Sequence, residues 1–325
     1  MGSVIDVHGH LMPDAVFDRV PEPMSVIYRD ESDKALVVDG VRGRFAPMLL
    51  READVRQRDQ AERGVDVSIV GPWIDMVKAA PTLESQVAWC QILTDALRDE
   101  ASGRSDLRFL AALPEIDGGA AADELERAVA SGAVGGLLAT TPQRDGLDAS
   151  HYDALWAAAE RLAVPIILHP GYFQPPANMR DFYLANSVGN PFETTLAVGR
   201  LVGADVPGRY PDLRLVLTHG GGYFPYQFGR MDAAFSRWPA NRDTKRRLPS
   251  ELLQWFSYDT VLFASEPLRY LLDLVGHERI LAGTDCPFMM ADYRPFTATS
   301  ELGLSAEETE AILGANAAAL FGIES

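Results

Sequence analysis

Four of the six histidines and one aspartate come directly after short apolar stretches of the sequence. They are His8, His10, His169, His219 and Asp285. Neutral imidazole nitrogens with one carboxylate oxygen suit zinc, or a metal of similar preference such as manganese, and such a set leaves a position open for water. A metal ion in such a site usually lowers the pKa of the water that it binds. These residue types therefore predict one divalent metal ion, with zinc the first choice.

The spacing of the candidates indicates which of them bind the metal. His8 and His10 are two residues apart, so on a β-strand both side chains point to the same face and can reach one ion. His169 and Asp285 would converge on the same point if their strands belong to a closed barrel. We therefore predict that His8, His10, His169 and Asp285 are the metal ligands.

His219 is predicted to be the proton-transfer residue rather than a further ligand. A metal that keeps an open position rarely collects four histidines, and the near-neutral pKa of imidazole suits proton transfer beside a metal-bound water. Glycines at 220–222 follow His219 and would let backbone or substrate approach closely. Asp285 is expected to take part in catalysis as well as in metal binding.

The scarcity of lysine excludes one kind of metal centre. Binuclear barrel hydrolases commonly bridge two metals with a carboxylated lysine at the end of the fourth strand. Here the three lysines are Lys34, Lys78 and Lys245, and the fourth apolar run ends in Ala139-Thr140-Thr141. A lysine-bridged pair of metals is therefore excluded, and a mononuclear site is predicted.

The elements that must position these residues alternate between strands and helices. Apolar, β-branched runs predict eight strands at Ser3–Val7, Val65–Val70, Arg108–Leu113, Val134–Ala139, Pro165–Leu168, Leu213–Thr218, Trp255–Val261 and Ile280–Gly283. Amphipathic stretches between them predict helices at Leu83–Glu100, Ala120–Ala130, Tyr152–Arg161, Thr194–Val202 and Ser265–Leu274. This pattern predicts an α/β protein with a (β/α)8 TIM barrel, and a doubly wound open sheet is the alternative.

The first βα unit contains an insertion. About 50 residues separate its strand from the helix expected around Asp54–Arg63, which is far more than a connecting loop needs. Residues 11–50, with a possible hairpin at Asp39-Gly40, are predicted to form a lid over the catalytic end of the barrel. No repeat or linker indicates a second domain, so residues 1–325 are expected to form one barrel. A C-terminal helix is expected from Ser305, its N-cap, to Phe321.

The composition limits the possible partners. The net charge is −17, which argues against nucleic-acid binding. No stretch is apolar for long enough to span a bilayer, and the first residues lack the features of a secretory signal. The two cysteines, Cys90 and Cys286, are too few for a disulfide scaffold. We expect a soluble, cytoplasmic protein that binds a small anionic molecule and neither nucleic acid nor membrane.

Several motifs together resemble a known family. They are His8-Gly9-His10, Asn190-Pro-Phe-Glu-Thr-Thr195, Thr218-His-Gly-Gly-Gly-Tyr-Phe-Pro225 with Gly229-Arg230, and Gly283-Thr-Asp-Cys-Pro-Phe288. The chain is similar over nearly its whole length to the metal-dependent decarboxylase branch of the amidohydrolase superfamily. The resemblance implies one zinc held by the His-x-His pair, His169 and Asp285, with His219 as the acid/base.

The resemblance also suggests residues that contact the substrate. Arg230 falls on the position of an arginine that is supplied to the neighbouring subunit's substrate carboxylate, which implies a homodimer. Phe288 matches an aromatic residue that contacts substrate. Independently of the resemblance, Trp73 and Phe173 follow predicted strands and are placed to line a pocket.

Two departures from the family pattern concern the substrate. Members that act on 2-amino-3-carboxymuconate 6-semialdehyde have an arginine where an ungapped comparison places Pro47, with Arg44 and Arg51 nearby. An aromatic residue of the family is replaced by Asn186. The substrate is therefore expected to differ from that semialdehyde.

These observations lead to three hypotheses. The first is a zinc-dependent, non-oxidative decarboxylase of an aromatic or unsaturated carboxylic acid. The second is a mononuclear-metal hydrolase or hydratase that acts on a lactone, an amide or a ring-cleavage product. The third, a binding or scaffold protein without catalysis, conflicts with the complete set of ligands.

Overall fold

Eight parallel strand positions close into a barrel in the part of the chain that the structure, a computed structural model, describes. This part comprises residues 2–21, 24, 27–30, 35–38, 41–43, 51–78, 80–142, 145–171, 176–238, 246–294 and 296–324. The barrel strands are β1 (Ile5–His10), β5 (Val67–Gly71), β6 (Leu107–Phe109) with β7 (Ala111–Ala112), β8 (Gly136–Ala139), β9 (Ile166–His169), β10 (Leu215–Leu217), β11 (Ser257–Asp259) and β12 (Ile280–Leu281).

The ring of strands is complete, which confirms the predicted barrel and shows that the open sheet was wrong. Going round the barrel, each of the first seven strand positions pairs in parallel with the next, with β6 and β7 together forming the third position. The third predicted run is divided because Leu110 donates to Val70 on one side, whereas Ala111 donates to Gly135 on the other. A bridge between Gly9 and Cys286 joins the last segment to β1.

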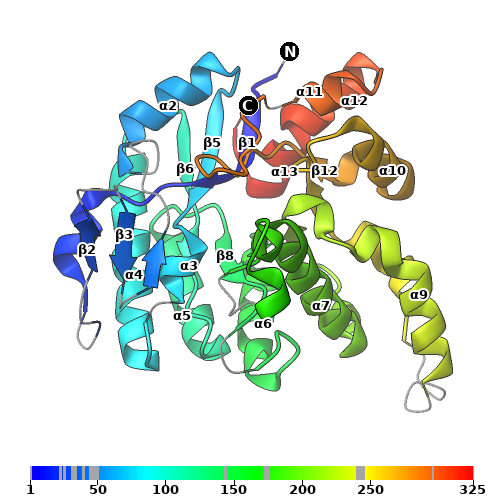
Figure 1. Cartoon of the computed structure of the whole chain (residues 1–325), viewed down its shortest axis with the longest axis horizontal. Helices are drawn as coiled ribbons and strands as arrows, with labels where there is room; N and C mark the ends of the chain where they lie inside the picture. The colour runs from blue at the N-terminus through cyan, green and yellow to red at the C-terminus, as the bar shows by residue number, and fades with distance from the viewer. Residues whose placement is uncertain are drawn as a thin grey trace.

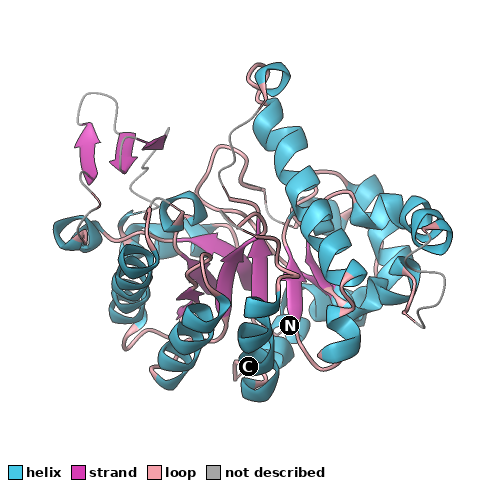
Figure 2. Ribbon diagram, turned by 90° about the horizontal axis from the view of Figure 1, so that it is seen from below, coloured by secondary structure: helices cyan, strands magenta, loops and turns pink. Residues whose placement is uncertain are grey.

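Helices surround the strands (Figure 2). They are α2 (Ala53–Glu62), α3 (Ile74–Val77), α4 (Leu83–Ala101), α5 (Gly118–Ala130), α6 (Asp153–Leu162), α7 (Asn190–Gly203), α8 (Val206–Arg209), α9 (Phe224–Arg237), α10 (Ser265–Val275), α11 (Thr297–Ser300), α12 (Ala306–Glu310) and α13 (Asn316–Phe321). Each predicted helix is present within a few residues, whereas the long helix α9 and the short helices α3, α8 and α11 had not been predicted. Ser305 caps α12 as expected, since its hydroxyl accepts a hydrogen bond from the Glu308 amide. A π-helical segment at Ala311–Ala315 lies between α12 and α13.

The buried apolar residues form two clusters. One cluster includes Ile69 and Leu137 on strands and Trp89 on α4. The other includes Leu168 on a strand and Leu201 on α7, so each cluster joins strands to covering helices. Because successive strand residues point to opposite faces, near-continuous apolar runs are needed to cover both faces of the strands.

The insertion after β1 contains a three-stranded antiparallel sheet of β2 (Ile27–Asp30), β3 (Ala35–Val38) and β4 (Val41–Gly43). Figure 2 shows this sheet to one side of the barrel. The predicted turn at Asp39-Gly40 lies outside the described residues, although Val38 pairs with Val41 on either side of it. The role of residues 11–50 as a lid stays a prediction.

Two composition-based expectations can be compared with the structure. Both cysteines are free and buried, so they form no disulfide. Among the described residues, no helix has the length and apolar character needed to cross a membrane.

Candidate metal centre and substrate cavities

The four predicted metal ligands meet at the carboxyl end of the barrel. His8 and His10 lie on β1, His169 is the last residue of β9, and Asp285 follows β12. Their ligand atoms all lie within 4.8 Å of one another, and all four residues are buried. Residues that are 277 positions apart in the chain are thus brought to one point by closure of the barrel.

The inner atoms of this cluster are arranged as a cation site. Asp285 Oδ1 lies 3.4 Å from His8 Nε2, 3.2 Å from His10 Nε2 and 3.9 Å from His169 Nε2. These four atoms are buried and have no hydrogen-bond partner. Because burying unpaired polar atoms is costly, their convergence fits a metal ion bound by three nitrogens and one oxygen.

The outer ring nitrogens are held so that the Nε2 atoms point inward. His10 Nδ1 lies 3.0 Å from the Pro72 carbonyl, and His169 Nδ1 lies 2.8 Å from the Pro170 carbonyl. His8 Nδ1 instead lies 2.6 Å from Asp259 Oδ2. An acceptor at Nδ1 places the proton there and leaves Nε2 unprotonated for a metal.

Without a metal, burial and the neighbouring charges shift the pKa values of the clustered residues. Burial lowers the pKa of His8, but the charge of Asp285 and the hydrogen bond to Asp259 outweigh it and raise this pKa to about 10. Burial dominates at His169, where it lowers the pKa to about 3, and also lowers the pKa of His10. Burial of Asp285 would raise its pKa, but the histidines hold it well below the usual range.

His219 lies beside the cluster rather than within it. Its Nε2 is 3.4 Å from Asp285 Oδ2, and 17% of its side chain is exposed. Its φ is 54°, and the next residue, Gly220, has a φ of 60°, so the chain turns through the left-handed region as it leaves β10. This conformation is unusual for histidine and is typical of functional sites. A Cβ at Gly222 would lie 2.3 Å from the Pro191 carbonyl oxygen, which explains one of the three glycines.

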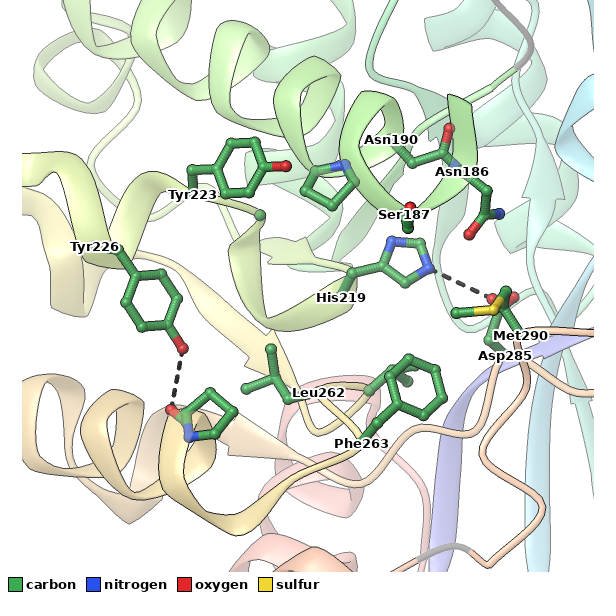
Figure 3. A pocket seen from close by; sticks show the side chains of 14 residues that line it. Asn186, Ser187, Asn190, His219, Tyr223, Tyr226, Leu262, Phe263, Asp285 and Met290 are labelled. Atoms are coloured by element: carbon green, nitrogen blue, oxygen red, sulfur yellow. Dashed lines mark hydrogen bonds and ion pairs between the residues drawn. The ribbon is translucent and has the colours of Figure 1, made fainter. Parts of the chain in front are cut away.

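Two cavities meet at His219 and Asp285. One has a volume of about 640 Å³ and the other of about 370 Å³. Asn186 and Asn190 also line both, and Figure 3 shows them above the His219 ring, with Asp285 below Asn186 and to the right of the imidazole. Among the described lining residues there is no lysine or arginine.

The predicted substrate residues differ in where they lie. Trp73 and Phe288 line the larger cavity, with ring centroids 5.4 Å apart, and Phe288 lies 4.9 Å from the His10 ring. Phe173 lies outside the described residues. Arg230 is exposed on α9 and lines neither cavity of its own chain.

The residues that mark the departures from the family pattern can be placed only in part. Pro47 and Arg44 lie outside the described residues. Arg51 forms an ion pair with Asp14, with an N–O distance of 2.6 Å. Asn186 lines both cavities, so the position that lacks the family's aromatic residue belongs to the site.

The sequence analysis did not identify Asp259 or Asn190. Asp259 ends β11 but lies two residues before the end of the predicted strand Trp255–Val261, and a carboxylate within that run was a signal that could have identified it. Asn190 begins α7 and opens the Asn190–Thr195 motif, but nothing in its spacing connected it with the histidines.

Comparison with known proteins decides the family. The family model described as amidohydrolase matches residues 5–323. The chain belongs to the amidohydrolase family. This membership confirms the resemblance inferred from the His-x-His, triple-glycine and Thr-Asp-Cys-Pro motifs.

Named relatives of this amidohydrolase are decarboxylases, that is, carbon–carbon lyases. The chain is 32% identical over 261 residues to gamma-resorcylate decarboxylase of Rhodococcus jostii (strain RHA1), which covers 74% of this chain and 78% of the relative. It is 24% identical to 2-amino-3-carboxymuconate-6-semialdehyde decarboxylase of Dictyostelium discoideum, over 98% of this chain and 92% of that protein. A solved dihydroxybenzoic acid decarboxylase from Polaromonas sp. JS666, with bound manganese and the inhibitor 2-nitroresorcinol, has the same fold, with a TM-score of 0.80, 23% identity and coverage of 99% and 98% of the two chains.

Proposed function

We propose that this protein is a metal-dependent, non-oxidative decarboxylase of an aromatic or unsaturated carboxylic acid. The observation that carries the proposal is the buried convergence of His8, His10, His169 and Asp285 beside His219. The decarboxylases among the relatives support the reaction class. The metal is proposed to be zinc, with manganese as the alternative that a related structure suggests.

The residues divide the chemistry between them. When bound, the ion would act as a Lewis acid on a substrate oxygen. Asp285 Oδ2 lies 3.4 Å from His219 Nε2, and because a carboxylate oxygen only accepts hydrogen bonds, it favours a proton on that nitrogen. The protonated imidazole of His219 donates this proton to the carbon that bears the carboxylate and becomes neutral. That carbon becomes tetrahedral, the bond to the carboxylate breaks with loss of CO2, and its electron pair restores the unsaturated system.

The lining of the larger cavity suits a planar substrate. Trp73 and Phe288 provide aromatic surfaces on one side, and flat rings pack well against such surfaces. The amides of Asn186 and Asn190, at the junction of the cavities, can bind polar ring substituents. Phe173 is retained as a proposed contact from the sequence.

We also propose that the active unit is a homodimer in which Arg230 reaches the substrate carboxylate of the other subunit. The described cavity lining offers no arginine or lysine, and Arg230 of a second subunit would supply a guanidinium that pairs with the carboxylate. Apolar side chains are exposed near the cavities, including Phe182, Phe192, Leu196 and Phe263. Helices α7 and α9 lie side by side (Figure 1), and Arg230 is on α9.

The proposed reaction is tested by incubating the zinc-loaded and manganese-loaded protein with dihydroxybenzoates, salicylates and carboxymuconates. CO2 release from at least one of them, with one solvent deuteron incorporated at the vacated carbon in deuterium oxide, is the expected result. If none of these compounds releases CO2, the proposal is contradicted. A product that retains oxygen from labelled water without CO2 release would instead indicate a hydrolase or hydratase. Elemental analysis of protein purified without added metal identifies the ion.

A further inference from the structure

One wholly buried carboxylate contacts both the candidate metal centre and the proton-transfer loop. Asp259 is the last residue of β11 and has no exposed surface. Its Oδ2 lies 2.6 Å from His8 Nδ1. Its Oδ1 accepts hydrogen bonds from the amides of Gly220, at 2.9 Å, and Val261, at 3.1 Å. Both oxygens are therefore occupied, each on a different part of the site.

The contact with Gly220 affects the direction in which His219 points. Gly220 directly follows His219, and both have left-handed backbone conformations, with φ values of 60° and 54°. A hydrogen bond from the Gly220 amide to a carboxylate is charge-assisted and therefore strong. It holds the chain at the point where the imidazole of His219 is directed toward Asp285.

The contact with His8 differs from those of the other two histidine ligands. His10 and His169 are oriented by the backbone carbonyls of Pro72 and Pro170, which no side-chain substitution removes. Only for His8 does a side chain select which ring nitrogen carries the proton. The metal-binding tautomer of His8 therefore depends on Asp259.

The neighbouring strand leaves room for this contact. A Cβ at Gly283 would lie 3.0 Å from the Cβ of Asp259 and 3.1 Å from that of His8. Both distances are tighter than ordinary packing allows. The glycine thus lets the two side chains approach each other across the end of the barrel.

We propose that Asp259 is a positioning residue that couples the metal centre to the acid/base. It keeps the proton on His8 Nδ1, so that Nε2 is free for the metal, and it holds the turn that carries His219. This inference rests on the proposed metal-dependent function, but its test measures metal binding and tautomer directly.

The substitution Asp259→Asn separates the two contacts. If the amide oxygen keeps the bonds from Gly220 and Val261, the amide NH2 faces His8 Nδ1 and can only donate. His8 is then driven to carry its proton on Nε2, where it blocks the metal. The expected result is zinc affinity weakened by about 10- to 100-fold in chelator competition. Asp259→Ala removes both contacts, so its kcat at saturating zinc should also fall below that of Asp259→Asn.

The matched control is Asp148→Asn, the same chemical change at a residue that pairs with Arg200 away from the site. Its zinc affinity should equal that of the unsubstituted protein. A second measurement needs no variant: histidine ¹⁵N NMR of the zinc-loaded protein should show the proton of His8 on Nδ1. A His8 protonated elsewhere, or wild-type zinc affinity in folded Asp259→Asn, would overturn the inference.

The two proposals can fail separately. If the unsubstituted protein decarboxylates nothing but Asp259→Asn loses zinc affinity, the proposed reaction is wrong and the role of Asp259 in the metal centre is supported. If decarboxylation is observed, and Asp259→Asn and Asp259→Ala both match the unsubstituted protein in zinc affinity and kcat, the proposed role of Asp259 is wrong.

Discussion

At the scale of single residues, the proposed site separates metal binding from proton transfer. The three ligand histidines are buried, and their Nε2 atoms face one carboxylate oxygen, Asp285 Oδ1. His219 lies against the other oxygen of the same carboxylate and reaches the cavities. Asp285, which the sequence predicted both as a ligand and as a catalytic residue, therefore lies between the two proposed functions.

The substitution His219→Asn tests this separation. Asparagine can hydrogen-bond but cannot exchange a proton near neutral pH, so kcat should fall by about 10²- to 10⁴-fold. The zinc content should remain near one ion per chain, since His219 lies outside the ligand set. Steady-state kinetics and elemental analysis of the same preparation measure both quantities. Loss of the metal together with activity would show that His219 is a ligand.

Metal affinity should depend on pH through His8. In the metal-free protein the carboxylates of Asp285 and Asp259 raise the pKa of His8 to about 10, against the opposing effect of burial. A metal must therefore displace one proton at any lower pH, whereas His169, with its pKa lowered to about 3, has none to lose. Between pH 6 and 9 the affinity should rise by about tenfold per pH unit. Chelator competition at several pH values measures the slope, and a flat profile would contradict this assignment.

At the scale of the elements, the ends of β1 and β12 are joined beneath the metal ligands. Asp6 on β1 accepts from the amide of Thr284, at 3.0 Å, and from its hydroxyl, at 2.7 Å. Arg56 on α2 is wholly buried and reaches Asp6 Oδ2 at 3.5 Å and the His10 carbonyl at 3.3 Å. These contacts fix the strand end that carries His8 and His10 relative to the segment that carries Asp285.

Gly9 is required because Arg56 occupies the space beside it. A Cβ at Gly9 would lie 2.1 Å from Arg56 Nη2. Gly9→Ala should therefore displace the guanidinium, lower the free energy of unfolding by about 1–3 kcal/mol and weaken zinc binding. Gly203→Ala is the control, because the nearest atom to its new Cβ, at 3.5 Å, is at an ordinary contact distance. Urea unfolding of both variants measures the difference, and equal stabilities would contradict the role assigned to Arg56.

At the scale of the whole molecule, the net charge of −17 opposes the approach of an anionic substrate to the site. An anionic substrate must approach an acidic protein, and the described cavity lining supplies no arginine or lysine. The divalent ion and Arg230 of a second subunit would provide the local positive charge. This is the physical reason for proposing that the site is completed by dimer formation.

Mixed dimers test the role of Arg230. Arg230→Ala and His219→Asn should each be nearly inactive alone. In a mixed dimer, the subunit with Arg230→Ala keeps its His219 and receives an intact Arg230 from its neighbour. Refolding the two variants together should restore about a quarter of the wild-type activity, because half of the dimers are mixed and each has one complete site. No recovery in verified mixed dimers would show that Arg230 does not act across an interface.

The sequence by itself determined most of the elements and which residues are candidates for the chemistry. Apolar runs that stop at histidine or aspartate marked the strand ends, and the spacing of His8 and His10 placed both on one face. These features are local, because the alternation of apolar and polar residues in a strand, and their periodicity in a helix, involve residues that are close together in the sequence. The same local signals predicted the four candidate metal ligands, the candidate acid/base His219 and the barrel, and the structure confirms the barrel.

Only the tertiary structure decided what supports those residues. Asp259 meets His8 across 251 positions, and Thr284 meets Asp6 across 278. Asn190 reaches the junction of the cavities because α7 begins there. Such contacts depend on closure of the barrel and on which buried polar group needs a partner. No periodicity or motif within one segment predicts these contacts, because the two contacting residues lie on different segments of the chain.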